Sequence, residues 1–432
     1  MELKKYKIGD LVQVTRGASL GGEFYATQGN YVRLTCGNFD YRNNCFKENQ
    51  SKDNIYYTGG FKEEFLLEKG DIITPLTEQA IGLLGSTARI PESGKYIQSQ
   101  DIAKIDCNES LLDKDFAFYL ISSACVKQQL SAAAQQTKIR HTSPDKIKEC
   151  TVWIPSLDIQ KRIGRILTDI DNKIAINRQI NDNLEAMAKQ LYDYWFVQFD
   201  FPNEDGKPYK SSGGVMVWNE KLKREIPQGW SDCVLGDYIG RITNGLNPRK
   251  NFVLGSGNNY YVTIRSLVGT TIDWNNCDRC DDEALSKINS RSQLQIGDII
   301  FSAIGTIGRT YYILEEPTNW NISETSFTLR AKENVPNDFF YGMLRSNEIQ
   351  IKADKAAMGS TLRCLVMDSL CSLQYIKIPS YMMKLFAAKV SPLYRQIHRN
   401  NKEIAELTKQ RDELLPLLMN GQATVNYHLS DD

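Results

Sequence analysis

The residues with the strongest potential for chemistry are few and lie far apart in this chain of 432 residues. Cys277 and Cys280 form the only CxxC pair among the ten cysteines, and a zinc site normally requires a second pair or nearby histidines. The three histidines, His141, His398 and His428, do not stand at metal-ligand spacing from this pair. We therefore expect reduced thiols and no metal site.

Motifs of enzymes that transfer phosphoryl, methyl or acyl groups are also missing from the sequence. The Gly94-Lys95 pair is followed by Tyr96 and lacks the upstream glycine of a phosphate-binding loop. No Asn-Pro-Pro-aromatic, Asp-Pro-Pro-aromatic, GxSxG or HExxH motif occurs. A nuclease-like set of carboxylates and a lysine could be assembled only from residues that precede a predicted helix or lie in a predicted linker. These residues are Asp145, Glu149, Glu204, Asp205 and Lys207. The sequence therefore predicts no catalytic residue on this chain.

The composition is typical of a soluble globular protein with several domains. Hydrophobic residues make up 41% of the chain and charged residues 24%. The sequence has no apolar run long enough for a membrane span, and the N-terminus lacks a signal-peptide core, so we expect a cytoplasmic protein without membrane contact. The 52 basic and 52 acidic residues balance, which argues against binding of nucleic acid through bulk charge alone.

Short segments recur in the same order along the chain. Gly70 of KGDII and Gly297 of IGDII are 227 residues apart, as are Gly9 of IGDL and Gly236 of LGDY. Further pairs are Asp115-Phe116 with Asp338-Phe339, Arg140 with Arg363, and Ile154-Pro155-Ser156 with Ile378-Pro379-Ser380. Their collinear order predicts two copies of one structural unit. Each copy opens with short alternating apolar runs between Gly, Asn and Thr turns, with helical stretches embedded, which is typical of an α+β domain.

After each Ile-Pro-Ser the apolar period becomes helical over about 40 residues, or roughly 60 Å of helix. In the first copy the stripe runs Ile163, Leu167, Ile170, Ile174, Ile180, Leu184, Met187 and Leu191. In the second copy it runs Phe386, Val390, Leu393, Ile397, Ile404, Leu407, Leu414 and Leu418. A narrow stripe on so long a helix needs a partner, and the other copy supplies one, so we expect an antiparallel coiled coil. Asn177 and Asn400 lie near the two midpoints, and we expect them to meet at a pseudo-twofold axis.

The predicted fold is α+β, with two pseudo-repeated domains separated by two long helices that form an antiparallel coiled coil. The expected boundaries are a first domain at 1–155, a long helix at 156–199, an extended linker at 200–225, a second domain at 226–379, a second long helix at 380–420 and a tail at 421–432. Two related domains held apart in this way can contact one face of a DNA duplex at two sites, and the helix length would then set the separation.

Three stretches resemble the specificity subunits of type I restriction–modification enzymes. They are IPSLDIQKRIGRIL with LYDYWFVQFDFP between Ile154 and Asp205, GKPYKSSGGVMVWNEKLKREIPQGW from Gly206 to Trp230, and SAIGTIGR from Ser302 to Arg309. The resemblance extends over essentially the whole chain and is most specific in the centre. The second copy departs from the pattern, because Met382-Met383-Lys384-Leu385-Phe386 replaces Asp158-Ile159-Gln160-Lys161-Arg162. This difference argues against a symmetric role for Gln160 and Arg162.

The resemblance implies a non-catalytic subunit with two target-recognition domains, each of which recognises one half of a bipartite, asymmetric site on double-stranded DNA. It implies helices that set the spacer and dock two methylation subunits, with restriction subunits in the full complex. S-adenosylmethionine, ATP and Mg would be bound by those partners, and this chain would hold no cofactor and no metal.

Residues suited to contact base edges or phosphates are Arg, Lys, Asn, Ser and Thr in loops and at strand ends. In the first domain these are Arg16, Ser19, Arg33, Arg89, Lys138 and Arg140. In the second domain they are Asn244, Arg249, Lys250, Arg265, Arg309, Ser360, Thr361 and Arg363. The seam of the coiled coil is predicted to comprise Ile163, Ile170, Ile174, Asn177, Leu184, Leu191, Leu393, Ile397, Asn400, Leu407 and Leu414. Two alternatives remain at this stage, namely a self-contained DNA methyltransferase or endonuclease and a coiled-coil scaffold protein.

Overall fold

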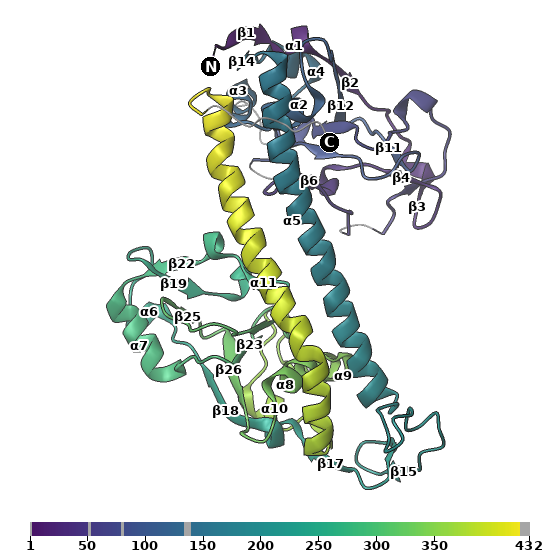
Figure 1. The fold of residues 1–432 in the computed structure, drawn as a ribbon, viewed down its shortest axis with the longest axis vertical. Coiled ribbons are helices and arrows are strands. Elements are labelled where there is room, and N and C mark those ends of the chain that lie inside the picture. Colours follow the sequence, from purple (N-terminus) through teal and green to yellow (C-terminus); the bar gives the residue numbers. More distant parts are fainter. Residues whose placement is uncertain (1, 51–52, 79–81, 134–139, 424–432) are drawn as a thin grey trace. The chain divides into compact units, whose positions relative to one another are not determined.

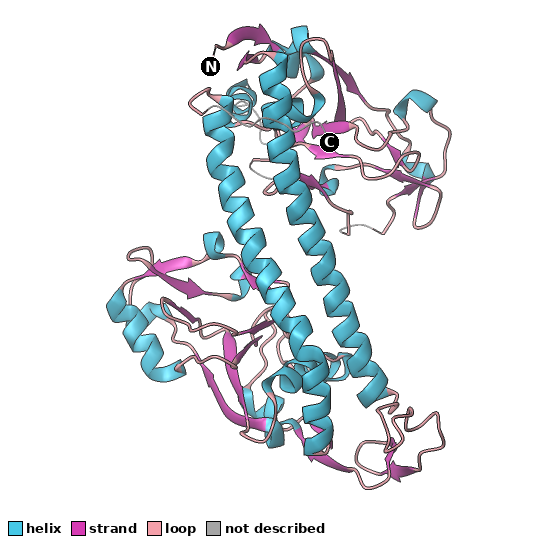
Figure 2. Cartoon of the chain, viewed as in Figure 1, coloured by secondary structure: helices cyan, strands magenta, loops and turns pink. Residues whose placement is uncertain are grey.

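The computed structural model describes residues 2–50, 53–78, 82–133 and 140–423, and the chain divides into two compact units. The first unit comprises Met1–Ala175 and Ala405–Asp432, and the second comprises Ile176–Ile404. Helices and small sheets are mixed in both units (Figure 2), so the expected α+β class is confirmed. None of the helices in the described part of the chain is long and apolar enough to cross a bilayer.

The first unit is built on two four-stranded sheets (Figure 1). One sheet is antiparallel, with the order β10-β8-β12-β2, and the other has the order β11-β4-β7-β3, with β11 parallel to β4. Their strands are β2 Val12–Arg16, β3 Tyr25–Ala26, β4 Tyr31–Arg33, β7 Tyr56–Tyr57, β8 Ile72–Pro75, β10 Ala88–Arg89, β11 Tyr96–Ile97 and β12 Ile102–Cys107. Three further pairs are β1 Lys4–Lys7 with β14 Thr151–Ile154, β5 Phe39–Asp40 with β6 Cys45–Phe46, and β9 Thr77–Glu78 with β13 Arg140–His141.

Helices cover the first unit and complete its main core. They are α1 Ile8–Leu11, α2 Lys114–Ile121, α3 Ala124–Ala133, α4 Pro144–Glu149 and the first part of α5 Leu157–Tyr192. The core joins Phe116 of α2 with Ile163 and Leu167 of α5, and Leu418 of α11 Ser380–Met419 packs into the same cluster. Burial of this apolar surface is the main force that holds the two long helices against the domain within this unit.

The second unit has a matching set of sheets. Its antiparallel sheet has the order β18-β26-β23-β24, and a three-stranded sheet has the order β22-β19-β25, with β25 parallel to β19. The strands are β18 Ile239–Asn244, β19 Asn259–Val262, β22 Asp278–Cys280, β23 Ile299–Ser302, β24 Thr310–Tyr312, β25 Trp320–Ile322 and β26 Ser326–Ala331, with the pairs β15 Met216–Asn219 and β16 Arg224–Pro227, β17 Ser231–Val234 and β27 Gln374–Lys377, and β20 Leu267–Val268 and β21 Thr271–Ile272. Its helices are α6 Pro248–Asn251, α7 Asp282–Ser292, α8 Asn337–Leu344, α9 Asn347–Ala356, α10 Met367–Cys371 and parts of α5 and α11.

The recurring Gly-Asp pairs form the same turn in both units. Gly70 and Gly297 have φ of 84° and 95°, a backbone region that glycine enters without steric cost. The following aspartate closes the turn, since Asp71 accepts a hydrogen bond from the Glu68 amide at 3.0 Å and Asp298 accepts one from the Gln295 amide at 2.9 Å. Each turn leads directly into the buried strand of its sheet, β8 or β23, so the sequence repeat is a repeat of structure.

The long helices pair in opposite directions within each unit. In the second unit, Asn177 of α5 contacts Glu403 of α11, whereas Tyr192, farther along α5, packs its ring on Phe386, earlier in α11. In the first unit, Leu414 and Leu418 of α11 pack in the cluster that contains the start of α5. The antiparallel pairing expected from the two apolar stripes is therefore present in each unit.

The predicted apolar stripe of the first long helix includes two residues, Ile180 and Met187, that the structure leaves exposed. Ile180 and Met187 are 39% and 54% exposed, whereas Asn181 and Ala188 are 5% and 2% exposed. Steps of three and four residues from Ile174 lead through Asn177, Asn181, Leu184 and Ala188, so a polar and a small residue occupy seam positions. A prediction that follows only apolar residue types therefore leaves Asn181 and Ala188 out of the seam.

The buried asparagines form a polar layer in the second unit, with partners different from those expected. Asn400 donates to the Asn181 side chain at 2.8 Å, and Asn181 donates to Asn401 at 2.8 Å. Asn177 donates to Glu403 at 2.9 Å. In place of the expected contact between Asn177 and Asn400, three neighbouring cross-helix contacts are present.

The expected extended linker at residues 200–225 is instead an ordered segment of the second unit. Asp200 accepts hydrogen bonds from the Ser211 amide at 2.7 Å and the Ser211 hydroxyl at 2.6 Å. Phe201 stacks on Tyr209 and on Trp230 with ring centroids 4.8 and 5.0 Å apart, and β15 pairs with β16 as a hairpin. The Pro, Gly and Ser content reflects turns between these contacts and not a loose connection.

Candidate nucleic-acid interface

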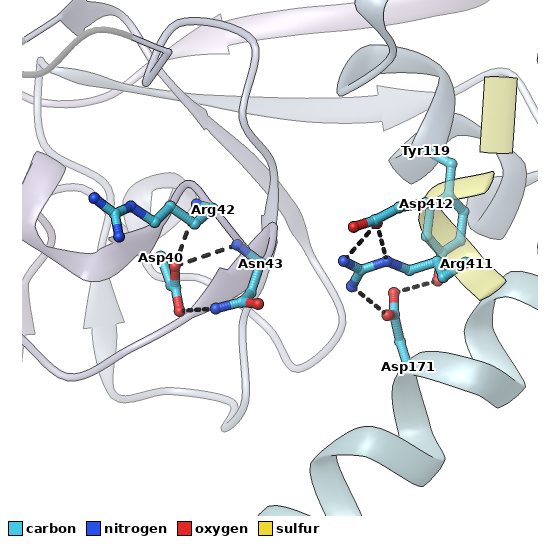
Figure 3. Close-up of polar contacts among 7 residues, drawn as sticks. All are labelled: Asp40, Arg42, Asn43, Tyr119, Asp171, Arg411 and Asp412. Carbon is cyan, nitrogen blue, oxygen red and sulfur yellow. Dashed lines mark hydrogen bonds and ion pairs between the residues drawn. The ribbon is translucent and has the colours of Figure 1, made fainter. Parts of the chain in front are cut away.

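An ionic cluster around the buried Arg411 joins helix α2 of the first domain to both long helices (Figure 3). The Tyr119 hydroxyl donates to Asp171 at 2.7 Å, and the Arg411 guanidinium contacts Asp171 at 2.9 Å and Asp412 at 2.8 Å. Burial and the nearby Asp171 carboxylate raise the pKa of the Tyr119 hydroxyl well above its usual range, so it stays protonated as a donor. This cluster determines how the domain and its loops are held on the helices of the first unit.

Two arginines predicted to contact DNA have partners within the first domain. Arg33 is only 7% exposed and lies 3.8 Å from the centre of the Tyr25 ring. Arg89 forms an ion pair with Asp115 at 2.6 Å and lies over the Phe118 ring. Arg33 is therefore unavailable to a duplex, and Arg89 already has a short ion pair that holds β10 against α2.

The remaining candidates of the first domain lie at strand ends and in loops. Arg16 is exposed at the end of β2, where its Nε donates to the Gln100 carbonyl at 2.7 Å, and Ser19 is exposed in the following loop. Lys138 lies outside the described residues. Arg140 belongs to β13, but its side chain is not among those described.

A hairpin that the sequence analysis missed presents further polar groups in the first domain. The β5–β6 turn is closed by Asp40, which accepts hydrogen bonds from the Arg42 amide at 3.2 Å and from the Asn43 side chain at 2.7 Å (Figure 3). Asn44 has a φ of 48°, a conformation that asparagine tolerates better than most residues. The Asp-x-x-Asn pattern of DYRNN is the sequence signal for this turn, and a two-stranded ribbon of this kind fits the major groove of DNA.

Loops of the second domain bring several predicted residues together. Arg309 donates from Nη1 to the carbonyls of Ile264 and Leu267, both at 3.0 Å. Arg265 lies between these two acceptors in the chain, its side chain is 77% exposed, and its nearest carboxylate, that of Asp278, is 4.0 Å away. Arg309 therefore fixes the turn that carries Arg265, which leaves Arg265 as the better placed group to contact a ligand.

A second loop holds the last three predicted residues. Ser360 and Thr361 are exposed. Arg363 is half-buried, forms an ion pair with Asp354 at 2.6 Å, and donates to the Ala357 carbonyl at 3.4 Å. Arg363 thus ties the end of α9 to this loop, and the two hydroxyl groups form its exposed part.

At the end of β18 and in the loop that follows it, the side chain that is presented differs from the one predicted from the sequence. The Asn244 side-chain oxygen already accepts two hydrogen bonds from Arg291, at 2.7 and 3.1 Å. Arg291, at the end of α7, was not among the predicted contacts. Arg249 is exposed in α6, and the side chain of Lys250 in the same helix is not among those described.

The described residues show no site for a metal ion. No group of three or more His, Cys, Asp or Glu side chains within residues 2–50, 53–78, 82–133 and 140–423 is placed to hold one. Burial raises the pKa of the Cys277 and Cys280 thiols, so both are protonated in the protein as it stands.

Residues 1–186 match the family model described as type I restriction modification DNA specificity domain. The chain is 26% identical over 356 residues to the type I restriction enzyme MjaIX specificity subunit of Methanocaldococcus jannaschii, which covers 80% of this chain and 78% of that protein. It is 22% identical over 469 residues to the HindI specificity subunit of Haemophilus influenzae, which covers 97% of this chain and 99% of that protein.

The fold has a similar counterpart among solved structures. The type I restriction–modification system S subunit from M. genitalium superposes with a TM-score of 0.56 at 16% sequence identity, over 97% of this chain and 96% of that one. At this identity the likeness supports the fold alone, and it includes both α+β domains and both long helices.

Proposed function

We propose that this chain, a member of the type I restriction–modification specificity subunit family, recognises a bipartite DNA sequence with one α+β domain for each half. The observation that carries the proposal is that the antiparallel four-stranded sheets of the two domains share one strand order, whereas the side chains of the loops differ. A common scaffold with different loops is suited to recognise two different short sequences. The recognised site would accordingly be asymmetric.

The chain would contribute recognition and no catalysis. Methylation would be carried out by two methylation subunits that bind S-adenosylmethionine, and DNA cleavage by restriction subunits that use ATP and Mg. Such a complex acts on chromosomal and incoming DNA, so we place it in the cytoplasm. The predicted domain limits, 1–155 and 226–379, would be the limits of the two recognition modules.

The long helices would have two tasks. They would set the spacer between the two half-sites, and they would dock the methylation subunits. In support, α5 and α11 each contribute residues to both compact units. The buried Asn181–Asn400 contact favours one register of the pair, which a defined spacer requires.

The exposed polar groups of the loops would make the DNA contacts. We assign this role to Arg16, Ser19, Arg249, Arg265, Ser360 and Thr361, together with Lys138, Arg140 and Lys250 as sequence-based candidates. Asn244, Arg309 and Arg363 have intradomain partners and would act mainly by fixing the loops. The β5–β6 hairpin with Arg42 and Asn43 would be a further contact of the first domain.

Co-expression with a methylation subunit tests the proposal. Methylated adenine would be mapped over the host genome with the subunit alone, with the complete pair, and with this chain alone. We expect a two-part motif with a fixed gap that occurs only when both chains are present. Methylation that is the same without this chain would contradict the recognition role, and methylation by this chain alone would contradict its lack of catalysis.

A further inference from the structure

Two arginines of the second domain converge on the end of helix α7. Arg241 of β18 donates to the Gln293 side chain at 3.0 Å and to the Arg291 carbonyl at 3.1 Å. Arg291 donates from Nε and Nη2 to the Asn244 side-chain oxygen. Strand β18 and the last turn of α7 thus hold both guanidinium groups in defined positions.

The charges of these two arginines are not neutralised within the domain by the contacts that hold them. All of those contacts are with amide or carbonyl oxygens, which are uncharged. The neighbouring Arg330 differs, because two bonds of 2.7 and 2.8 Å pair it with the buried carboxylate of Asp298. Lys287 on the same helix is also paired, with Glu283 at 2.7 Å.

The backbone at this place is specialised to hold the cluster. Gln293 follows the last turn of α7 with a φ of 45°, a conformation that costs about 1 kcal/mol or more in a residue other than glycine. Its side chain accepts from Arg241 and its carbonyl accepts from Arg330 at 2.9 Å. A phosphate is well recognised by a planar guanidinium group that is held rigidly and still has N–H donors that make no other hydrogen bond. Arg241 and Arg291 meet that description.

We propose that Arg241 and Arg291 bind the phosphate backbone of DNA and that Asn244 is the positioning residue for Arg291. The inference rests on the proposed function, because it names contacts of the second domain with the same duplex. It also makes Asn244 a support for Arg291 in place of the DNA contact expected from the sequence. Backbone contacts would give this domain affinity and orientation without sequence preference.

The test measures the salt dependence of DNA binding by the complex of this chain with the methylation subunits. Arg241→Gln, Arg291→Gln and the double variant would be compared with Lys287→Gln, which removes the same charge from the same helix at a paired position. The slope of log affinity against log salt is negative, and each lost phosphate contact is expected to reduce its magnitude by about 0.9, so that raising salt from about 50 to 200 mM weakens binding about 3.5-fold less than in the wild type. Lys287→Gln should leave the slope unchanged.

The positioning role of Asn244 has its own readout. Asn244→Ala should reduce the magnitude of the salt slope as Arg291→Gln does. The two changes together should reduce it no further than Arg291→Gln alone. A purely structural asparagine would lower the melting temperature and leave the salt slope as it is. Thermal unfolding of every variant controls for loss of fold.

Three results would overturn the inference. Slopes equal to the wild type in both arginine variants would show that no phosphate is bound there. A changed base at one position of the methylated motif would assign the arginines to base contacts. Calorimetric binding of inorganic pyrophosphate at the cluster, with an unchanged DNA slope, would indicate a free-anion site. An unrelated duplex serves alongside the target, so the slopes remain measurable even if the wild type shows no sequence preference and the proposed function fails.

Discussion

At the scale of single residues, Arg411 joins more charged partners than any other side chain in the cluster of Figure 3. Its side chain is 9% exposed and contacts Asp171 and Asp412, and Asp171 also accepts from Tyr119. An ion pair of this kind stabilises little by itself, because desolvation opposes the attraction, but removal of one partner leaves an uncompensated charge. The stability of the first unit should therefore respond strongly to loss of this one cation.

Arg411→Ala is expected to lower the free energy of unfolding by about 3 kcal/mol, as for a broken buried pair. The double variant Arg411→Met with Asp171→Asn should recover most of that loss, because it removes both charges and leaves the Tyr119 hydroxyl an acceptor. Urea denaturation followed by circular dichroism would measure both. Arg399→Ala, at an exposed position of the same helix, is the control and should change the value by about 0.5 kcal/mol or less. Equal losses at positions 399 and 411 would contradict the argument.

Sequence could nominate arginines for DNA contact but could not sort them by environment. Arg33 and Arg89 have the same loop or strand-end context as Arg16 in the sequence. Their partners, Tyr25 and Asp115, become neighbours only when the sheets and α2 assemble. Tertiary contacts determine which partner an arginine side chain binds, and local sequence spacing carries no information about that partner.

At the scale of elements, helix α5 packs on α2 so closely that one glycine is required. A Cβ on Gly164 would lie 2.7 Å from the Phe116 amide nitrogen and 2.9 Å from the Asp115 Cβ. Real side chains do not approach backbone atoms at that distance, so one of the two helices would have to move. The spacing between α5 and the recognition domain of the first unit depends on this absence of a side chain.

Gly164→Ala should therefore destabilise the protein although alanine is the better helix former. In an exposed helix the change would gain about 1 kcal/mol, whereas overpacking at this site is expected to cost about 1–3 kcal/mol. Ala175→Gly, on an exposed position of the same helix, isolates helix propensity and should cost about 1 kcal/mol. Urea midpoints would give both values. A more stable Gly164→Ala variant would mean that α2 and α5 separate without cost.

The long helices could be predicted because their apolar period persists over many turns, and α5 and α11 are found within the expected ranges. The details of the seam could not. Asn181 and Ala188 are buried by the opposing helix and the second domain, and neither type is apolar enough or large enough to mark a seam. The hairpin at residues 216–227 was missed because contacts from outside it help to hold it, since Asn219 and Lys221 both donate to Asp232.

At the scale of the whole molecule, the repeat was visible in the sequence because its markers are turns with strict requirements. Gly70 and Gly297 must adopt positive φ, and the aspartate after each must close the turn. The loops between the markers carry no such requirement, so the two copies diverge there. Fold was therefore predictable from the repeat, whereas the recognised bases are not, because loop geometry and DNA shape both decide them.

The proposed role of the helices leads to a prediction about the spacer. Asp171 faces Arg411 in the first unit and Asn177 faces Glu403 in the second. An insertion after Lys173 must therefore be matched by one in α11 between Glu406 and Lys409, or the antiparallel partners would be displaced. A heptad in each helix keeps the seam in phase, and it adds about 10 Å of helix.

We expect the matched heptad insertions to lengthen the gap between the two half-sites by about three base pairs, at about 3.4 Å per pair along each strand. Both half-sites should keep their sequences, because the loops of the two domains are unchanged. Mapping of methylated adenine with the methylation subunit present would measure the gap. A matched insertion of two residues is the control, since at about 100° per residue it turns the rest of each helix by roughly 200°, takes the seam out of phase and should abolish methylation. An unchanged gap with the heptads would mean that contacts other than α5 and α11 set the spacer.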